Sequence, residues 1–212
     1  MPDSVLIISA VSPVPVDNGK RLILHGLLEY FVDRLRPENV HYALLGGPGE
    51  MRPDFPGIAH RLNRPGSGAQ LATLARRFAT DRSYTAQEAL LGSNGLRDEI
   101  QVLVAWLRPT IEIYDTIRIG QHAPAEPRSR RRVLYLDDLF SVRYETMLDL
   151  AGTGAISFDQ LGEFAMHVPL PLRALIKRSA VYLPVLRMER DRISRREIQM
   201  VREFDASLLV NP

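Results

Sequence analysis

Short apolar runs that alternate with helical segments are the feature that most constrains the fold of this chain. Val5–Ala10 reads VLIISA, which is typical of a strand buried on both faces. Leucines and a phenylalanine then recur at helical spacing across Leu22–Phe31. Strands that are each followed by a helix favour a parallel sheet with right-handed crossovers, so the sequence predicts an α/β, Rossmann-like fold.

The rest of the chain continues this alternation. Further strands are predicted at Asn39–Leu45, Thr110–Asp115, Arg132–Asp137 and Ala206–Val210. Helices are predicted at Gln70–Phe78, at Ala86–Leu107 with a division near Gly92 and Gly95, and over most of Val142–Phe204 with breaks near 152–154 and 169–171. The stretch from Met51 to Gly68, rich in Pro, Gly and Arg, is predicted to be a loop.

Composition limits the functional classes. The 212 residues, 45% hydrophobic and 25% charged, are those of an ordinary globular protein, and we expect a single domain over 1–212. The absence of cysteine excludes disulfides and thiolate chemistry. A net charge of +2 argues against a nucleic acid partner. No apolar run approaches the roughly 20 residues that span a bilayer and no secretory leader is recognisable, so we expect a cytoplasmic protein.

Ligands of open α/β sheets bind outside the carboxyl ends of the strands, so the residues that follow each strand are the candidates for a site. Asn18, Gly19 and Lys20 form a turn between the first strand and the first helix. Glycine permits close backbone approach, and a helix N-terminus attracts phosphate. The same turn is equally compatible with a plain Asn-Gly hinge. The dinucleotide and P-loop glycine patterns are absent, which argues against NAD and ATP as cofactors.

Asp137 and Asp138 follow a later strand and are the candidates for acid–base chemistry. Ser141 and Arg143 come just after them and are candidates for binding a substrate. The alternative for Asp138 or Ser141 is a structural role as the N-cap of the next helix.

Arg118 and His122 follow the Thr110–Asp115 strand and could line the same edge of the sheet. The alternative for a lone histidine such as His122 is a hydrogen-bonded residue at the surface. The histidines lack ligand spacing, so no metal site is predicted.

An arginine-rich segment spans residues 187–205. Its interspersed acidic residues favour an amphipathic helix with Glu–Arg pairs on a solvated face. A second interpretation is peripheral contact with anionic lipid at the inner face of the membrane.

These segments, in their order, resemble the N-terminal domain of family 4 glycosyltransferases, which are retaining enzymes of the GT-B fold. The Pro-rich loop ending in Asp17-Asn18-Gly19-Lys20 is similar to a family loop that ends in Asn-Gly-Gly, with lysine in place of the second glycine. RRVLYLDDLFSVRYE, residues 131–145, is similar to a segment of exopolysaccharide sugar transferases. Residues 205–212 resemble the closing strand of the domain, so the resemblance covers essentially the whole chain.

The resemblance implies one half of a GT-B fold that binds the acceptor. The donor domain, with its nucleotide-sugar pocket, would follow Pro212, and this chain alone would be inactive without it. The full enzyme would transfer a sugar from a nucleotide-diphosphate sugar to a glycan or lipid-linked acceptor, without a further cofactor. Asn18, Gly19 and Lys20 would face the donor phosphates, and Asp137 would position or activate the acceptor hydroxyl.

By the same resemblance, Arg118 and His122 would line the acceptor pocket. Two alternatives remain open. One is a stand-alone Rossmann-like module that binds a phosphorylated ligand or a protein partner without catalysis. The other is a small hydrolase that uses Asp137 and His122.

Overall fold

In the part of the chain that the structure describes, six strands form one sheet in which every neighbouring pair is parallel. The computed structural model describes residues 3–46, 55–80, 84–124, 130–137, 139–152 and 179–210. The strand order β3-β2-β1-β4-β5-β6 is that of the Rossmann fold, which confirms the predicted fold class. The strands are β1 (Val5–Ser9), β2 (Val40–Leu45), β3 (Ile58–Leu62), β4 (Ile111–Asp115), β5 (Arg131–Asp137) and β6 (Ala206–Leu209).

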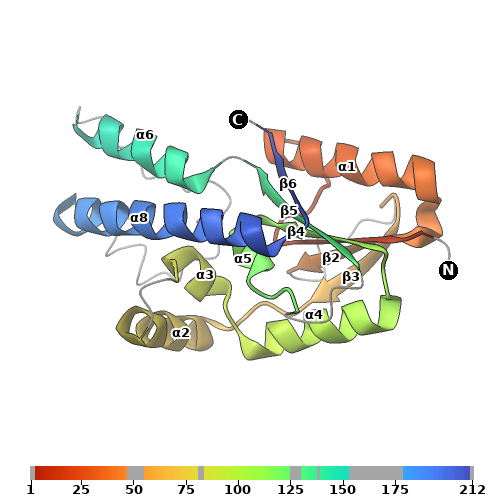
Figure 1. Cartoon of the computed structure of the whole chain (residues 1–212), viewed down its shortest axis with the longest axis horizontal. Coiled ribbons are helices and arrows are strands. Elements are labelled where there is room, and N and C mark those ends of the chain that lie inside the picture. Colours follow the sequence, from red (N-terminus) through yellow and green to blue (C-terminus); the bar gives the residue numbers. More distant parts are fainter. Residues whose placement is uncertain are drawn as a thin grey trace.

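Helices cover both faces of this sheet, with α1 on the side opposite to α4 (Figure 1). A short 3-10 turn, Pro37–Asn39, leads from α1 into β2. The described helices are α1 (Gly19–Leu35), α2 (Ser67–Thr80), α3 (Ala86–Leu91), α4 (Asn94–Leu107), α5 (Thr116–Gly120), α6 (Phe140–Gly152) and α8 (Ser179–Glu203).

The central strand β1 contributes to two hydrophobic cores. Leu6 and Ile8 are fully buried in the core that includes residues of α3, α4, α5 and α8. Val5 and Ile7 are fully buried in the second core, beneath Leu24 and other residues of α1. Alternate side chains of a strand point to opposite faces, so burial on both faces requires the continuous apolar run seen in the sequence.

The prediction of an unbroken loop from Met51 to Gly68 is wrong. Within it, Ile58–Leu62 forms β3 and pairs with β2, while 51–54 lie outside the described residues. This strand has a partner on one side only, and its residues are largely half-buried or exposed. An edge strand of this kind needs no continuous apolar run, and the sequence signal is correspondingly weak.

The predicted division of the Ala86–Leu107 helix is confirmed. Gly92 ends α3, and Ser93 caps α4 by accepting a hydrogen bond from the Leu96 N–H at 3.0 Å. The predicted break near 152–154 begins where α6 ends, and the break near 169–171 lies outside the described residues. Among the described helices, none combines the length and the apolar character that crossing a bilayer requires.

Candidate functional site

The carboxyl ends of β1, β4 and β5 bring charged side chains together at the point where the strand order reverses. Lys20, in the first turn of α1, places its Nζ 2.8 Å from Asp115 Oδ1 at the end of β4. The same Nζ lies 3.9 Å from Asp137 Oδ2 at the end of β5. The reversal between β1 and β4 is the position at which open α/β sheets bind ligands. We refer to Lys20, Asp115 and Asp137 as the switch-point cluster.

Asp115 is fixed in this cluster by two donors. Ser9, the last residue of β1, donates its hydroxyl to Asp115 Oδ2 at 2.6 Å, and Lys20 occupies Oδ1. The Asp115 side chain is almost completely buried. A buried carboxylate needs such partners, so we assign Asp115 to orienting Lys20 rather than to proton transfer.

Asp137 offers a more accessible carboxylate. The Tyr135 hydroxyl donates to its Oδ1 at 2.9 Å. Its Oδ2 accepts no hydrogen bond from the described residues. The Lys20 ammonium lies 3.9 Å from this oxygen, which is too far for a hydrogen bond. This oxygen is therefore available to accept a proton or hydrogen bond from a ligand hydroxyl.

The backbone at this edge is unusual in two adjacent strands. Thr116, directly after β4, has φ 66°, and Asp137, at the end of β5, has φ 64°. A left-handed conformation is a clear outlier for a β-branched residue such as threonine. Backbone strain of this kind concentrates at functional sites, which supports a binding role for this edge.

Arg118 belongs to the same edge. It donates from Nε to Thr116 Oγ1 at 3.2 Å, and its Cζ lies 4.7 Å from the centre of the Phe140 ring. Burial lowers the pKa of its guanidinium, while Asp115 and Asp137 act in the opposite direction. The Arg143 Cζ lies 5.6 Å from the same ring, so two guanidinium groups flank Phe140.

The residues of the predicted phosphate loop, Asn18, Gly19 and Lys20, have different roles in the structure. Asn18 caps α1, accepting a hydrogen bond from the Arg21 N–H at 3.0 Å, which gives it a structural function. A Cβ at Gly19 would meet nothing within 4 Å, so the helix N-terminus faces open space there. The Lys20 side chain points to the other two members of the switch-point cluster, Asp115 and Asp137.

Ser141 lies at the start of α6 and has a structural partner. Its hydroxyl donates to Glu197 Oε2 at 2.6 Å, and the Phe140 N–H donates to Glu197 Oε1 at 2.7 Å. Glu197, from α8, thus caps the N-terminus of α6 from a distant part of the chain. Asp138 lies outside the described residues.

His122 has its described contacts away from the switch-point cluster. It is buried, and its Nε2 lies 3.1 Å from the Leu91 carbonyl at the end of α3. Burial lowers its pKa to about 4, and the positive charges of Arg97 and Arg77 act in the same direction. The described contacts give no link between His122 and Asp137.

Sequence reasoning missed one member of the cluster, Asp115, and two residues that donate hydrogen bonds to the cluster, Ser9 and Tyr135. Asp115, Ser9 and Tyr135 were assigned to strands, so they were not counted among the residues that follow strands. The last side chain of a strand can itself face the ligand edge. Including the terminal residue of each predicted strand would have found Asp115, whereas Ser9 lies one residue before the predicted end of the first strand, Ala10.

The described residues contain no group of three His, Asp or Glu side chains arranged as metal ligands. Comparison with known proteins gave no significant match to a family model, a curated protein or a solved structure.

Proposed function

We propose that this chain is the acceptor-binding domain of a retaining glycosyltransferase that uses a nucleotide-diphosphate sugar. The proposal rests on the order of motifs along the sequence and on one structural observation. That observation is the convergence of Lys20, Asp115 and Asp137 at the strand-order reversal of a Rossmann-like sheet. The acceptor is a glycan or a lipid-linked sugar.

In this proposal Asp137 Oδ2 accepts a hydrogen bond from the acceptor hydroxyl and orients it for transfer. Tyr135 holds the other carboxylate oxygen, which fixes the direction of the free one. Lys20 adds positive charge beside the N-terminus of α1, where the donor diphosphate would approach Gly19 through open space. Arg118 and Arg143 border the acceptor position.

The complete gene product that contains this chain provides the test. It is assayed for sugar transfer with a panel of nucleotide-diphosphate sugars and lipid-linked acceptors. Asp137→Asn keeps the shape of the side chain and removes its charge. Loss of an orienting contact costs about a hundredfold in turnover, with little change in the KM for the donor.

Asp33→Asn is the matched control, because Asp33 is an exposed carboxylate near the far end of α1. It should leave turnover unchanged. Equal turnover of Asp137→Asn and the unmodified protein would remove Asp137 from the acceptor site. Absence of transfer with every donor and acceptor pair would argue against the glycosyltransferase assignment itself.

The alternative function is a module that binds a phosphorylated ligand or a protein partner without catalysis. The close contact of Lys20 with Asp115 favours it, because this pairing reduces the positive charge that Lys20 offers to a donor. Binding of nucleotide sugars without turnover in the complete gene product would support this alternative.

Peripheral contact with anionic lipid through α8 is a separate proposal, and the structure limits which arginines could take part in it. Arg192 and Arg196 of this helix are buried, and Arg196 donates from Nε to Glu88 Oε1 at 2.8 Å. These two arginines stabilise the interior and are not presented to lipid. Sedimentation with anionic vesicles, compared with neutral ones, tests what the exposed arginines of α8 contribute.

A further inference from the structure

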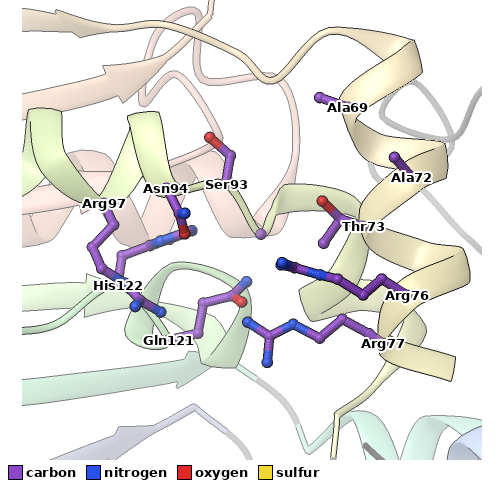
Figure 2. A pocket seen from close by; sticks show the side chains of 11 residues that line it. Ala69, Ala72, Thr73, Arg76, Arg77, Ser93, Asn94, Arg97, Gln121 and His122 are labelled. Atoms are coloured by element: carbon purple, nitrogen blue, oxygen red, sulfur yellow. The ribbon is translucent and has the colours of Figure 1, made fainter. Parts of the chain in front are cut away.

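A second candidate site lies away from the switch-point cluster, between α2, the α3–α4 corner and the end of α5 (Figure 2). It is a cavity of about 380 Å³, large enough for a small metabolite. Arg76 and Arg77 extend into it from α2, and Arg97 lies on the opposite side, on α4. We call this space the arginine cavity.

The charged side chains among the described residues that line this cavity are arginines. No Asp or Glu occurs among the described residues that line it. Arg77 is held in place by the Tyr84 ring, whose centre lies 3.6 Å from its Cζ. The described residues provide no ion-pair partner for Arg97. Guanidinium groups attract anions, and their planar donor sets match the oxygens of phosphate.

The N-terminus of α4 adds to this field. Ser93 and Asn94, at the start of this helix, line the cavity. Ser93 Oγ accepts the hydrogen bond from the Leu96 N–H, while the first N–H groups of any helix have no intrahelical acceptor. The helix dipole further favours a negative charge at this end.

His122 gives independent evidence for a ligand. It lines the cavity, is 1% exposed, and its Nδ1 is buried without a hydrogen-bond partner. The Leu91 carbonyl, 3.1 Å from Nε2, can only accept, so Nε2 carries the proton of the neutral ring. Nδ1 is then an unprotonated acceptor. A buried acceptor of this kind requires a donor, and the lining arginines or a ligand hydroxyl can supply one.

We propose that the arginine cavity binds the phosphate group of a small phosphomonoester. Arg76, Arg77 and Arg97 contact the phosphate oxygens, and a hydroxyl on the phosphate or beside it donates to His122 Nδ1. The assignment is independent of sugar transfer at the switch-point cluster.

Calorimetric titration of the full chain with inorganic phosphate tests this site. Sulfate is the comparator, because at neutral pH it resembles phosphate in size but carries no proton to donate. Saturable binding of phosphate, tighter than that of sulfate, is expected. Glycerol 3-phosphate should compete for the same site.

Variants that remove one arginine charge test whether phosphate binds in the arginine cavity. Arg97→Gln and Arg76→Gln should each weaken phosphate binding about tenfold, the effect of losing one charge-assisted hydrogen bond. Arg202→Gln makes the same change at an exposed position on α8 and should leave binding unchanged. Neither Arg76 nor Arg97 is buried, so these variants should retain the fold.

A nitrogen-resolved NMR spectrum of the histidine rings provides a readout specific to the cavity. The His122 Nδ1 signal, identified by its loss in His122→Gln, should shift as phosphate is added and should shift less in Arg97→Gln.

Three results would overturn the proposal. They are the absence of saturable phosphate binding, binding that both arginine variants leave intact, and a preference for sulfate. Phosphatidic acid vesicles distinguish a lipid headgroup from a soluble ester. Vesicle binding that soluble phosphate fails to displace would overturn the assignment to a small phosphomonoester.

Discussion

Lys20 and Asp115 form a direct ion pair across 95 positions of sequence, with 2.8 Å between Nζ and Oδ1. The contact joins the first turn of α1 to the end of β4. It thereby ties the predicted phosphate loop to the strand-order reversal.

Removing the Lys20 charge should destabilise the protein. In Lys20→Met the buried Asp115 carboxylate retains the Ser9 hydroxyl and the more distant charge of Arg118 but loses the cation in direct contact with it. Breaking one side of a buried pair costs about 3 kcal/mol, and the partly exposed position of Lys20 places the expected loss at the lower end of that effect. Urea denaturation measures the difference in the free energy of unfolding.

The companion variant is Asp115→Asn, alone and combined with Lys20→Met. The double-mutant cycle should give a coupling energy of about 1–3 kcal/mol. Additive losses would mean that the two side chains do not interact in solution. In that case Lys20 would be available to a ligand without first leaving Asp115.

Ser141→Ala separates a structural role from a binding role. Ser141 donates to buried Glu197, so Ser141→Ala should lower the free energy of unfolding by about 1–2 kcal/mol through loss of this hydrogen bond to a carboxylate. Thermal and urea denaturation provide the measurement.

The matched control is Ser194→Ala, a serine on the same α8 helix that carries Glu197. It should change stability much less. A Ser141→Ala protein with normal stability and impaired acceptor binding would instead support the role that the sequence resemblance implies.

Glu189 should make stability depend on pH. Burial raises its pKa from 4.5 to about 7, with the Ala86 N–H at 2.8 Å acting in the opposite direction. The folded state therefore holds the proton more tightly than the unfolded state. The resulting stabilisation is complete below about pH 4.5 and is lost as the pH rises to about 7.

Glu189→Gln retains an acceptor for the Ala86 N–H and removes the ionisation. The variant should match the unmodified protein near pH 4.5 and exceed it by about 3 kcal/mol near pH 8. Denaturation midpoints across this range test the difference. Glu38→Gln, at an exposed position, is the control and should show no such trend.

The contribution of His122 to stability has the opposite dependence on pH. Its pKa is lowered to about 4, so its contribution is complete above about pH 6.5 and is lost as the pH falls toward 4. Because His122 is present in both proteins, its contribution cancels in the difference between Glu189→Gln and the unmodified protein. A difference that grows toward low pH would contradict the assignment to Glu189.

Sequence reasoning predicted the buried strands because both of their faces are apolar. The apolar run at the start of the chain predicted a strand buried on both faces, which is β1, whereas β3 was missed because an edge strand needs no such run. The rule that ligands bind at strand ends directed attention to the edge where Lys20 and Asp137 meet. The pairing of Lys20 with Asp115 could not be predicted, since it depends on which strands become neighbours.

Arg118 and His122 illustrate a second limit. They are four residues apart, and the sequence suggested one pocket for both. The short helix α5 directs Arg118 toward Thr116 and Phe140, while His122, beyond its end, contacts the Leu91 carbonyl. Within so short a helix the apolar pattern is too brief to fix the direction of each side chain.

The cap that Glu197 places on α6 has a consequence for the order in which the protein assembles. Glu197 lies 57 positions after Phe140 and accepts a hydrogen bond from the Phe140 N–H. During synthesis the corner that follows Asp137 emerges well before its cap, and α6 has no anchored start until α8 docks. We therefore expect the corner after β5 to reach its final structure late in folding, once α8 has been synthesised and has docked.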